Sequence, residues 1–383
     1  MISADEFWWD NITGPRRFVT KVLSVLNQNQ VALLEVPSDL PWRHTMRGEI
    51  EARFRDSMDS SEIVIDPIDA KDDIGNEEPG TFILNRYAAF DEEIRDGFRE
   101  TKNNNIQKYI KKNKVIKNRI VWIKGLSADS ARDWITFCEK YKIDGITEGC
   151  FVLEIQGRVD RTEMSNIQII PYEEYVTQHD VQLFNSQYLD EKYDYSEGWK
   201  MYISALCAQL CETDAEISKS LIDLGDFDRV SPELLIERIA ADDEFVRRGA
   251  DEDSGHILSI VRQKDKKEIQ NRIWRAQIQV FFPVIELERI NLIDKWIDKI
   301  QDALTNNFVK QYDIQIYDPY DAELGTLFYL NTHRDHDGKY KLHIPEQADR
   351  ENIVFLHTCR NLLAHVKCCS PDQIKKLLAI GSV

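Results

Sequence analysis

The sequence predicts an α/β domain with a mostly parallel sheet, followed by an all-α helical region and a C-terminal helical bundle. Short apolar runs alternate with helical patterns over roughly the first 170 residues, and such alternation favours parallel strands with helices on both faces. From Ser196 onward the spacing of apolar residues is helical, and the longest helical pattern lies in the last third. We expect domains at 1–190, 191–255 and 256–383, the middle one being a helical lid or linker.

The first domain begins with an aromatic, helical stretch, and the run Val31–Val36, ended by Pro37, predicts a buried strand. The spacing of apolar residues then predicts further strands over 62–66, 119–124, 151–155 and 166–170, and helices over 45–56, 88–98 and 128–142.

Helical spacing continues through the rest of the chain. It predicts helices over 199–211, 215–224, 232–240, 257–287 (with a kink or restart at Pro283), 290–300, 322–330, 352–365 and 373–378. The alternation over 311–317 predicts a short strand or extended arm. His333, Asp335, His336 and Asp337 resemble a metal cluster in composition, but Asp337-Gly338 favours a turn between 327–331 and 340–344, and we expect no metal.

The net charge of −18 is distributed unevenly. Residues 1–257 carry 31 Lys and Arg against 50 Asp and Glu, whereas the chain from Leu258 onward carries 18 against 17. The acidity therefore argues against a nucleic-acid partner for the first two thirds only. Residues 101–124 are an exception, with eight basic residues and no acid. Such a run is usually a solvated face, and the alternative is a nucleic-acid contact through Lys108, Lys111, Lys112 and Lys114.

The seven cysteines lack paired C-x-x-C spacing, which favours reduced thiols. No apolar run approaches 18 residues, and the start of the chain lacks the pattern of a secretory signal. We therefore expect a cytoplasmic protein with no membrane partner.

The loop after the first strand runs from Pro37 to Thr45. The order of strands and helices around it resembles the nucleotide-binding core of AAA+ and STAND-type P-loop ATPases, and Trp122 and Gly125 fall where that family ends its Walker B strand. The loop has no glycine and no lysine, so Arg43 and Thr45 are the remaining candidates for cofactor binding. The third strand ends in Lys124, where a metal-binding acid is expected. We predict a degenerate domain that does not hydrolyse ATP and needs no cofactor; nucleotide binding without hydrolysis stays open.

The sequence Arg360-Asn361-Leu362-Leu363-Ala364-His365 reads R-N-x-x-A-H. Arginine offers a permanent planar charge to a phosphate, and histidine titrates near neutrality. This motif, placed after long helices, resembles the signature of HEPN domains, many of which are metal-independent ribonucleases. The resemblance implies that His365 is the general acid or base, that Arg360 stabilises the phosphate and that Asn361 orients one of them. It also implies an RNA substrate, no metal and a homodimer.

Two functions remain. A degenerate STAND-like core fused to a HEPN-like tail resembles bacterial conflict systems such as antiphage defence and toxin modules. That resemblance implies a sensor–effector that cleaves RNA when triggered and works with partner proteins of a defence operon. The alternative is a non-enzymatic adaptor, in which a pseudo-ATPase and an inactive bundle serve partner binding and dimerisation. In that case Arg360 pairs with a carboxylate or a carbonyl, and His365 is a histidine at a helix end.

Overall fold

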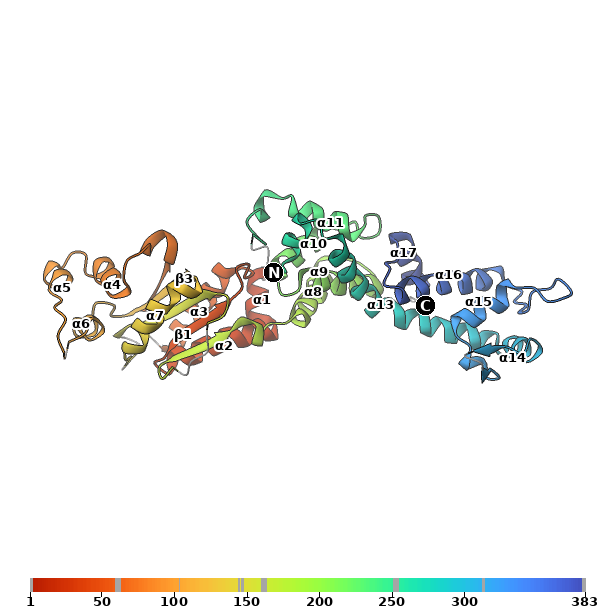
Figure 1. The fold of residues 1–383 in the computed structure, drawn as a ribbon, viewed down its shortest axis with the longest axis horizontal. Helices are drawn as coiled ribbons and strands as arrows, with labels where there is room; N and C mark the ends of the chain where they lie inside the picture. The colour runs from red at the N-terminus through yellow and green to blue at the C-terminus, as the bar shows by residue number, and fades with distance from the viewer. Residues whose placement is uncertain are drawn as a thin grey trace. The chain divides into compact units, whose positions relative to one another are not determined.

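The fold is described here from a computed structural model (Figure 1). It describes residues 3–58, 63–102, 104–143, 145, 148–159, 164–250, 255–311 and 314–380. The chain divides into two compact units. The first comprises the chain up to Phe184 together with Thr213–Glu216, and the second comprises Asn185–Glu212 and the chain from Ile217 onward. None of the helices in the described ranges combines the length and hydropathy that crossing a bilayer requires.

A five-stranded parallel sheet forms the centre of the first unit, with the spatial order β2-β3-β4-β1-β5. The strands are β1 Val31–Val36, β2 Val64–Asp69, β3 Arg119–Leu126, β4 Cys150–Gln156 and β5 Ile167–Pro171. In the middle of the sheet, Leu33 lies opposite Leu153 on β4 and Ile169 on β5. All six residues of β1 are buried, which explains the nearly continuous apolar run in the sequence. The predicted parallel α/β domain is confirmed.

Helices cover both faces of this sheet. The helical elements of this part of the chain are α1 Ala4–Asn11, α2 Thr13–Asn27, α3 Arg43–Met58, η1 Ala70–Ile74, α4 Pro79–Tyr87, α5 Glu92–Asp96, α6 Ile106–Lys112, α7 Ala128–Lys140, η3 Tyr172–Glu174 and α8 Gln178–Lys192. On one face, Phe82, Ile110 and Trp134 from α4, α6 and α7 join Leu33 and Leu153 in one core. α1, α2 and α3 pack on one another, and α2 packs on β1 and β5, which covers the other face.

Two sequence predictions in the first unit need correction. The helix expected over 88–98 is wrong: α4 starts earlier, with Pro79 at its beginning, and ends at Tyr87. Only α5 falls in the expected range, where the Asp91 side chain caps it by accepting from the Ile94 backbone N–H. The second strand continues past Asp66 through Pro67, because β2 is an edge strand and tolerates a residue without an N–H.

The second unit is mostly helical, as the sequence predicts. Its remaining elements are α9 Glu197–Cys211, α10 Ala215–Leu224, α11 Pro232–Ala240, η4 Asp243–Phe245, α12 Ile257–Arg262, α13 Lys266–Lys295, α14 Ile297–Asn306, β6 Lys310–Gln311, β7 Ile314–Gln315, η6 Pro319–Asp321, α15 Leu324–Thr332, α16 Gln347–Ala364 and α17 Pro371–Ile380. The long helix α13 packs against both α9 and α16, and α15 packs against α16.

α13 runs through Pro283 as one helix, so of the two predicted outcomes the restart is wrong and the kink stays a prediction. Val280, Phe281 and Ile285 are buried around the proline, and this packing holds the helix together across it. The predicted turn at Asp337-Gly338 is confirmed, since Arg334 and Tyr340 form an antiparallel bridge around it. The segment before the turn is helix α15, and the arm expected over 311–317 is the short β6–β7 pair, with 312 and 313 outside the described residues.

Candidate functional site

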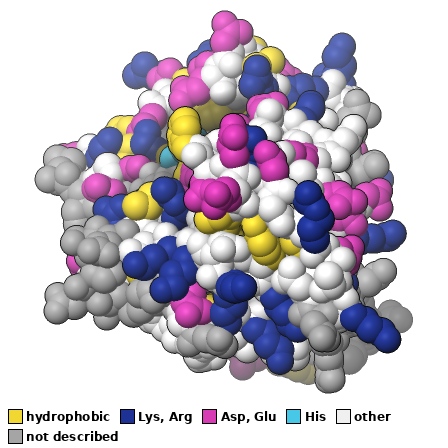
Figure 2. Space-filling view, turned by 90° about the vertical axis from the view of Figure 1, so that its left-hand side faces the viewer, with side chains coloured by type: hydrophobic (Ala, Val, Ile, Leu, Met, Phe, Trp, Pro, Cys, Tyr) yellow, Lys and Arg dark blue, Asp and Glu magenta, His cyan; other side chains and the backbone are white. Residues whose placement is uncertain are grey.

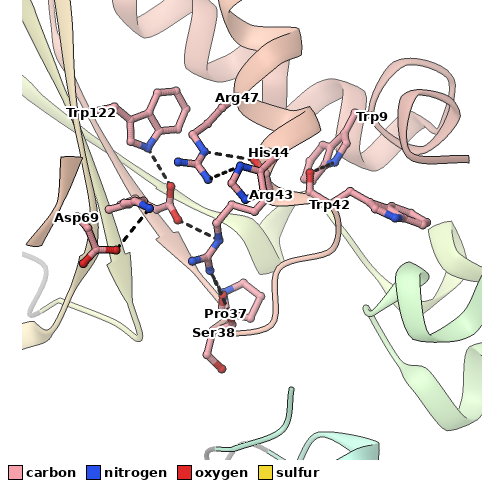
Figure 3. A network of polar contacts seen from close by, with 11 residues as sticks. Trp9, Pro37, Ser38, Trp42, Arg43, His44, Arg47, Asp69 and Trp122 are labelled. Atoms are coloured by element: carbon pink, nitrogen blue, oxygen red, sulfur yellow. Dashed lines mark hydrogen bonds and ion pairs between the residues drawn. The ribbon is translucent and has the colours of Figure 1, made fainter. Parts of the chain in front are cut away.

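The β1–α3 loop is closed by contacts within the protein (Figure 3). The Arg43 Nε atom lies 3.1 Å from Oε1 of Glu154 on β4, and Arg43 Nη2 donates to the Pro37 and Ser38 carbonyl oxygens, each at 3.1 Å. Glu154 is 1% exposed and also accepts a 2.8 Å hydrogen bond from Trp122 Nε1 on β3. The guanidinium therefore neutralises a buried carboxylate and fixes the loop above it.

The other groups of this loop are also engaged. Thr45 Oγ1 donates to Asp5 Oδ2 at 2.6 Å, which ties α3 to α1. The Trp42 backbone N–H donates to Glu216 Oε2 at 2.9 Å, and the Trp42 carbonyl accepts from Trp9 Nε1 at 3.2 Å. A P-loop offers its backbone N–H groups to phosphate. In this loop the Trp42 N–H already donates to a carboxylate of the protein, and the side chains of Arg43 and Thr45 are already bonded to other parts of the fold.

The end of β3 carries a cation. Lys124 Nζ lies 3.4 Å from Asp69 Oδ2 at the end of β2. The neighbouring His44, at the start of α3, has its pKa lowered by burial and by the charge of Arg47. The end of β3 therefore carries an ion-paired lysine, at a position where the resemblance to P-loop ATPases would require a metal-binding acid.

The basic segment has a solvent-facing side on α6. Lys108, Lys112 and Lys114 are exposed. Lys111 instead donates to the Lys142 carbonyl oxygen at 2.9 Å and lies 3.6 Å from Glu148 Oε2. Figure 2 shows Lys and Arg side chains gathered over the lower part of the face that it views, while the upper part mixes them with Asp and Glu. Three of the four predicted lysines therefore reach solvent.

The R-N-x-x-A-H motif lies at the end of α16, which is held against α13. Trp274 Nε1 on α13 donates to the Leu363 carbonyl oxygen at 2.7 Å, which satisfies one of the last carbonyls of the helix. Just beyond the helix, Gln277 exchanges two buried hydrogen bonds with the Cys369 backbone, at 2.6 and 3.2 Å. His365 is the C-cap residue directly after α16, and it is exposed. The end of the motif helix is thus held to α13 by hydrogen bonds, and His365 is accessible to solvent.

A cavity of about 510 Å³ opens beside the motif between α15 and α16, and we call it the motif cavity. Its lining residues are Phe328, Val354, His357, Thr358, Asn361, Leu362, His365 and Lys367. Asn361 and His365 therefore line one cavity. Arg360 is not among the lining residues: its Nη1 lies 3.4 Å from Asn361 Oδ1, and its Nη2 lies 3.8 Å from Glu323 Oε2.

His357 is a member of this site that sequence reasoning missed. Its Nε2 lies 3.0 Å from Asn361 Nδ2, and its ring stacks on Phe328 with the centroids 4.1 Å apart and the planes at 14°. Because an amide Nδ2 only donates, His357 Nε2 accepts and the imidazole is neutral. Burial lowers the pKa of His357, and the nearby charge of Arg360 adds to this. The sequence did contain a signal for this residue, because His357 precedes Asn361 by one helical turn and the two side chains therefore lie on the same face of the helix.

Comparisons with known proteins give no family. No protein-family model matches the chain, and no curated protein matches it. Among solved structures, thirteen chains match. One belongs to Drosophila ORC bound to poly(dA/dT) DNA and Cdc6, at 12% identity and a TM-score of 0.27, covering 97% of this chain and 70% of that one. Another belongs to Drosophila ORC bound to GC-rich DNA and Cdc6, at 12% and 0.26, covering 98% and 72%. Alignments with TM-scores in this range do not establish a shared fold.

Proposed function

We propose that the second unit is a metal-independent endoribonuclease of HEPN type, and that the motif cavity is its active site. The observation that carries the proposal is the line of contacts from Arg360 through Asn361 to His357, next to His365 on the same cavity. A permanent cation, an amide and two imidazoles meet the needs of phosphodiester transfer without a metal.

The proposed reaction is attack of a ribose 2′-oxygen on the adjacent phosphorus. The P–O5′ bond breaks, so that the products are a 2′,3′-cyclic phosphate and a 5′-hydroxyl. The 2′-hydroxyl loses a proton and the leaving 5′-oxygen gains one; His365 carries out one of these two transfers, and water supplies or accepts the other proton. Arg360 offsets the charge that develops on the phosphoryl oxygens, and Asn361, held by His357, keeps Arg360 beside the cavity. Two copies of the chain would bring two such sites together, so the active form is proposed to be a homodimer.

The first unit is proposed to sense the trigger or to recruit partner proteins in a defence or toxin-type system. Growth provides the test. Expression of the wild-type chain under its trigger is expected to arrest cells and fragment RNA, and His365→Ala is expected to abolish both. His343→Ala is the matched control, because His343 is an exposed histidine outside the motif cavity. If arrest survives in folded His365→Ala, the ribonuclease proposal is lost.

A second function is favoured by the β1–α3 loop. Glu154 pairs with the Arg43 guanidinium and Glu216 accepts from the Trp42 N–H, so these two groups are not available to a nucleotide. This unit therefore fits a pseudo-ATPase that serves as a scaffold for partner proteins. Under this adaptor function, His365→Ala would leave the phenotype intact, while disruption of the loop would remove it. A strict monomer of 44.8 kDa in solution would count against the ribonuclease function, since it cannot bring two motifs together.

A further inference from the structure

A cavity of about 490 Å³ lies along helix α2 in the first unit, and we call it the α2 cavity. Its lining residues are Asn11, Thr13, Arg16, Arg17, Thr20, Lys21, Ser24 and Tyr175. Three of these residues carry a positive charge, four carry a hydroxyl group and none is an acid. The volume lies within the range of cavities that bind small ligands, about 300–1,000 Å³. The α2 cavity is therefore cationic, although the surrounding part of the chain is acidic overall.

Among the residues that the structure describes, the cations of the α2 cavity have no counter-ion. The Arg16 and Arg17 guanidinium groups make no hydrogen bond, ion pair or ring contact there, and the Lys21 ammonium group makes none either. Every other described arginine of the first unit contacts a carboxylate, a carbonyl oxygen, a histidine or an aromatic ring. Acids are not scarce, since residues 1–257 carry 50 of them against 31 bases. The α2 cavity thus gathers three charges that the fold leaves uncompensated.

These charges also oppose the local preferences of α2. Arg16 completes the first turn of the helix, where the helix dipole favours an acid, and that turn holds no acid. Arg17 and Lys21 are four residues apart, and like charges at this spacing destabilise a helix. Natural sequences tend to break such local rules at functional sites. An anion in the cavity would turn this repulsion into attraction.

Contacts within the first unit hold the two walls of the α2 cavity together. The Gly14 N–H donates to Asp180 Oδ1 at 3.0 Å, and a Cβ atom on Gly14 would lie 2.6 Å from that carboxylate and from the Tyr175 carbonyl oxygen. The Tyr175 ring packs edge-on against Phe18 of α2, with the ring centroids 5.9 Å apart. Burial and the charge of Glu174 raise the pKa of Tyr175, so its O–H remains a donor at neutral pH.

The hydroxyl groups along α2 divide into a donor and an acceptor. Ser24 Oγ accepts from Gln28 Nε2 at 3.2 Å, which leaves the Ser24 O–H to donate to a ligand. Thr20 Oγ1 donates to the Arg16 carbonyl oxygen at 2.8 Å and can only accept. Two guanidinium groups, an ammonium group and hydroxyl donors therefore surround the cavity, and this combination suits a compact anion of high charge.

We propose that the α2 cavity binds a phosphomonoester group, with Arg16, Arg17 and Lys21 around its oxygen atoms. Such a group carries a charge of about −1.5 to −2 at pH 7 and three acceptor oxygens, which matches these cations. A nucleic acid offers one charge per phosphate, and the acidic surroundings would repel a long polyanion. In Mg-ATP the metal occupies the β- and γ-phosphate oxygens, so Mg-ATP does not present this group. The inference goes beyond the proposed function and does not depend on RNA cleavage.

Isothermal titration calorimetry of the purified full chain in EDTA, at one low salt concentration, tests the site. The probes are inorganic phosphate, glucose 6-phosphate and a short peptide with one phosphoserine, and the matched controls are glucose and the unphosphorylated peptide. We expect saturable binding of the phosphorylated probes and none of the controls. The tighter of the two esters identifies the source of the group, a small molecule or a phosphorylated side chain.

Variants of the lining cations separate binding from folding. Arg17→Gln and Lys21→Gln should each weaken binding about tenfold or more, as expected for loss of a hydrogen bond to a charged group. Arg132→Gln, at a 76% exposed arginine outside the cavity, should leave the affinity unchanged. Without ligand, Arg17→Gln should keep or raise the Tm of the first unit, because it removes one of two like charges on α2.

Three results would overturn the site. They are no saturable binding of any phosphorylated probe, binding of inorganic phosphate with neither ester, and equal affinity of the wild type and Arg17→Gln for the tighter ester. None of them bears on RNA cleavage, so failure of this site and failure of the ribonuclease proposal are distinguishable.

Discussion

Replacing Arg43 with alanine removes the cation that contacts the buried Glu154 carboxylate. Breaking a buried ion pair by deleting one partner costs about 3–5 kcal/mol, because the remaining charge is left in a poor solvent. Arg43 is 20% exposed, which places the pair at the lower end of that range. The hydrogen bonds to the Pro37 and Ser38 carbonyls are lost as well, but water reaches that side of the loop. We expect the first unit to lose about 3 kcal/mol.

Urea and thermal unfolding followed by tryptophan fluorescence would measure this loss. For a unit of this size, about 3 kcal/mol lowers Tm by about 6–12 °C. The matched control is Arg132→Ala, since Arg132 is 76% exposed and lies 3.9 Å from the 92% exposed Asp129. Such a surface pair contributes about 0–1 kcal/mol. In addition, Arg43→Ala with Glu154→Gln should recover part of the loss, because the uncompensated charge is gone. If Arg43→Ala behaves like Arg132→Ala, the assignment of the loop as an internal clamp is wrong.

Three further predictions follow from contacts in the two units. Millimolar Mg-ATP should leave the Tm of the first unit unchanged, because the Trp42 N–H already donates to Glu216 and Arg43 already pairs with Glu154. A ligand present at 100 times its Kd would raise the free energy of unfolding by about 2.7 kcal/mol, so a rise in Tm of several degrees would contradict the prediction. Trp274→Phe should lower the free energy of unfolding of the second unit by about 1 kcal/mol and slow RNA cleavage, because it removes the hydrogen bond to the Leu363 carbonyl at the end of α16. Trp296→Phe, which loses a hydrogen bond to Asp349, is the control and should leave cleavage unchanged. Equal cleavage rates in the two variants would contradict the idea that Trp274 supports the motif. Because the pKa of His357 is lowered in the folded chain, the unfolded chain binds a proton below about pH 6.5 that the folded chain does not, so the free energy of unfolding of the wild type should fall faster with acid than that of His357→Gln. The control is His343→Gln, which should follow the wild type. Parallel plots of unfolding free energy against pH from 7.5 to 5 for the wild type and His357→Gln would refute the prediction.

The strands of the first unit were predictable because a central parallel strand is buried on both faces. Val31–Val36 is such a strand, and its apolar run needs no knowledge of its neighbours. The helix over 88–98 was mispredicted because start signals compete: Pro79 begins α4 early, and Asp91 caps a separate short helix. Local sequence patterns thus locate an element well where its residues are completely buried. They locate it less well where capping residues determine the boundaries of a helix.

The candidate sites depend on contacts that sequence spacing does not reveal. Arg43 and Thr45 stood out as possible nucleotide ligands, and both are used by Glu154 and Asp5, which lie far away in the chain. In the second unit, the motif pointed to Arg360 and His365, whereas Asn361 and His365 are the two motif residues that line the cavity, and Phe328 on α15 stacks on His357 from outside the motif. The motif identified the helix, and only packing showed which side chains share its cavity.

The measurement that tests the central claim most directly is RNA cleavage by the purified full chain in the presence of EDTA, with analysis of the product ends. We predict fragments that end in 2′,3′-cyclic phosphate and 5′-hydroxyl groups from the wild type and from His343→Ala. Loss of cleavage by 100-fold or more is expected in His365→Ala, on the order of what general acid–base catalysis contributes. Intact RNA with the dimeric wild type, or undiminished cleavage by His365→Ala, would contradict the account.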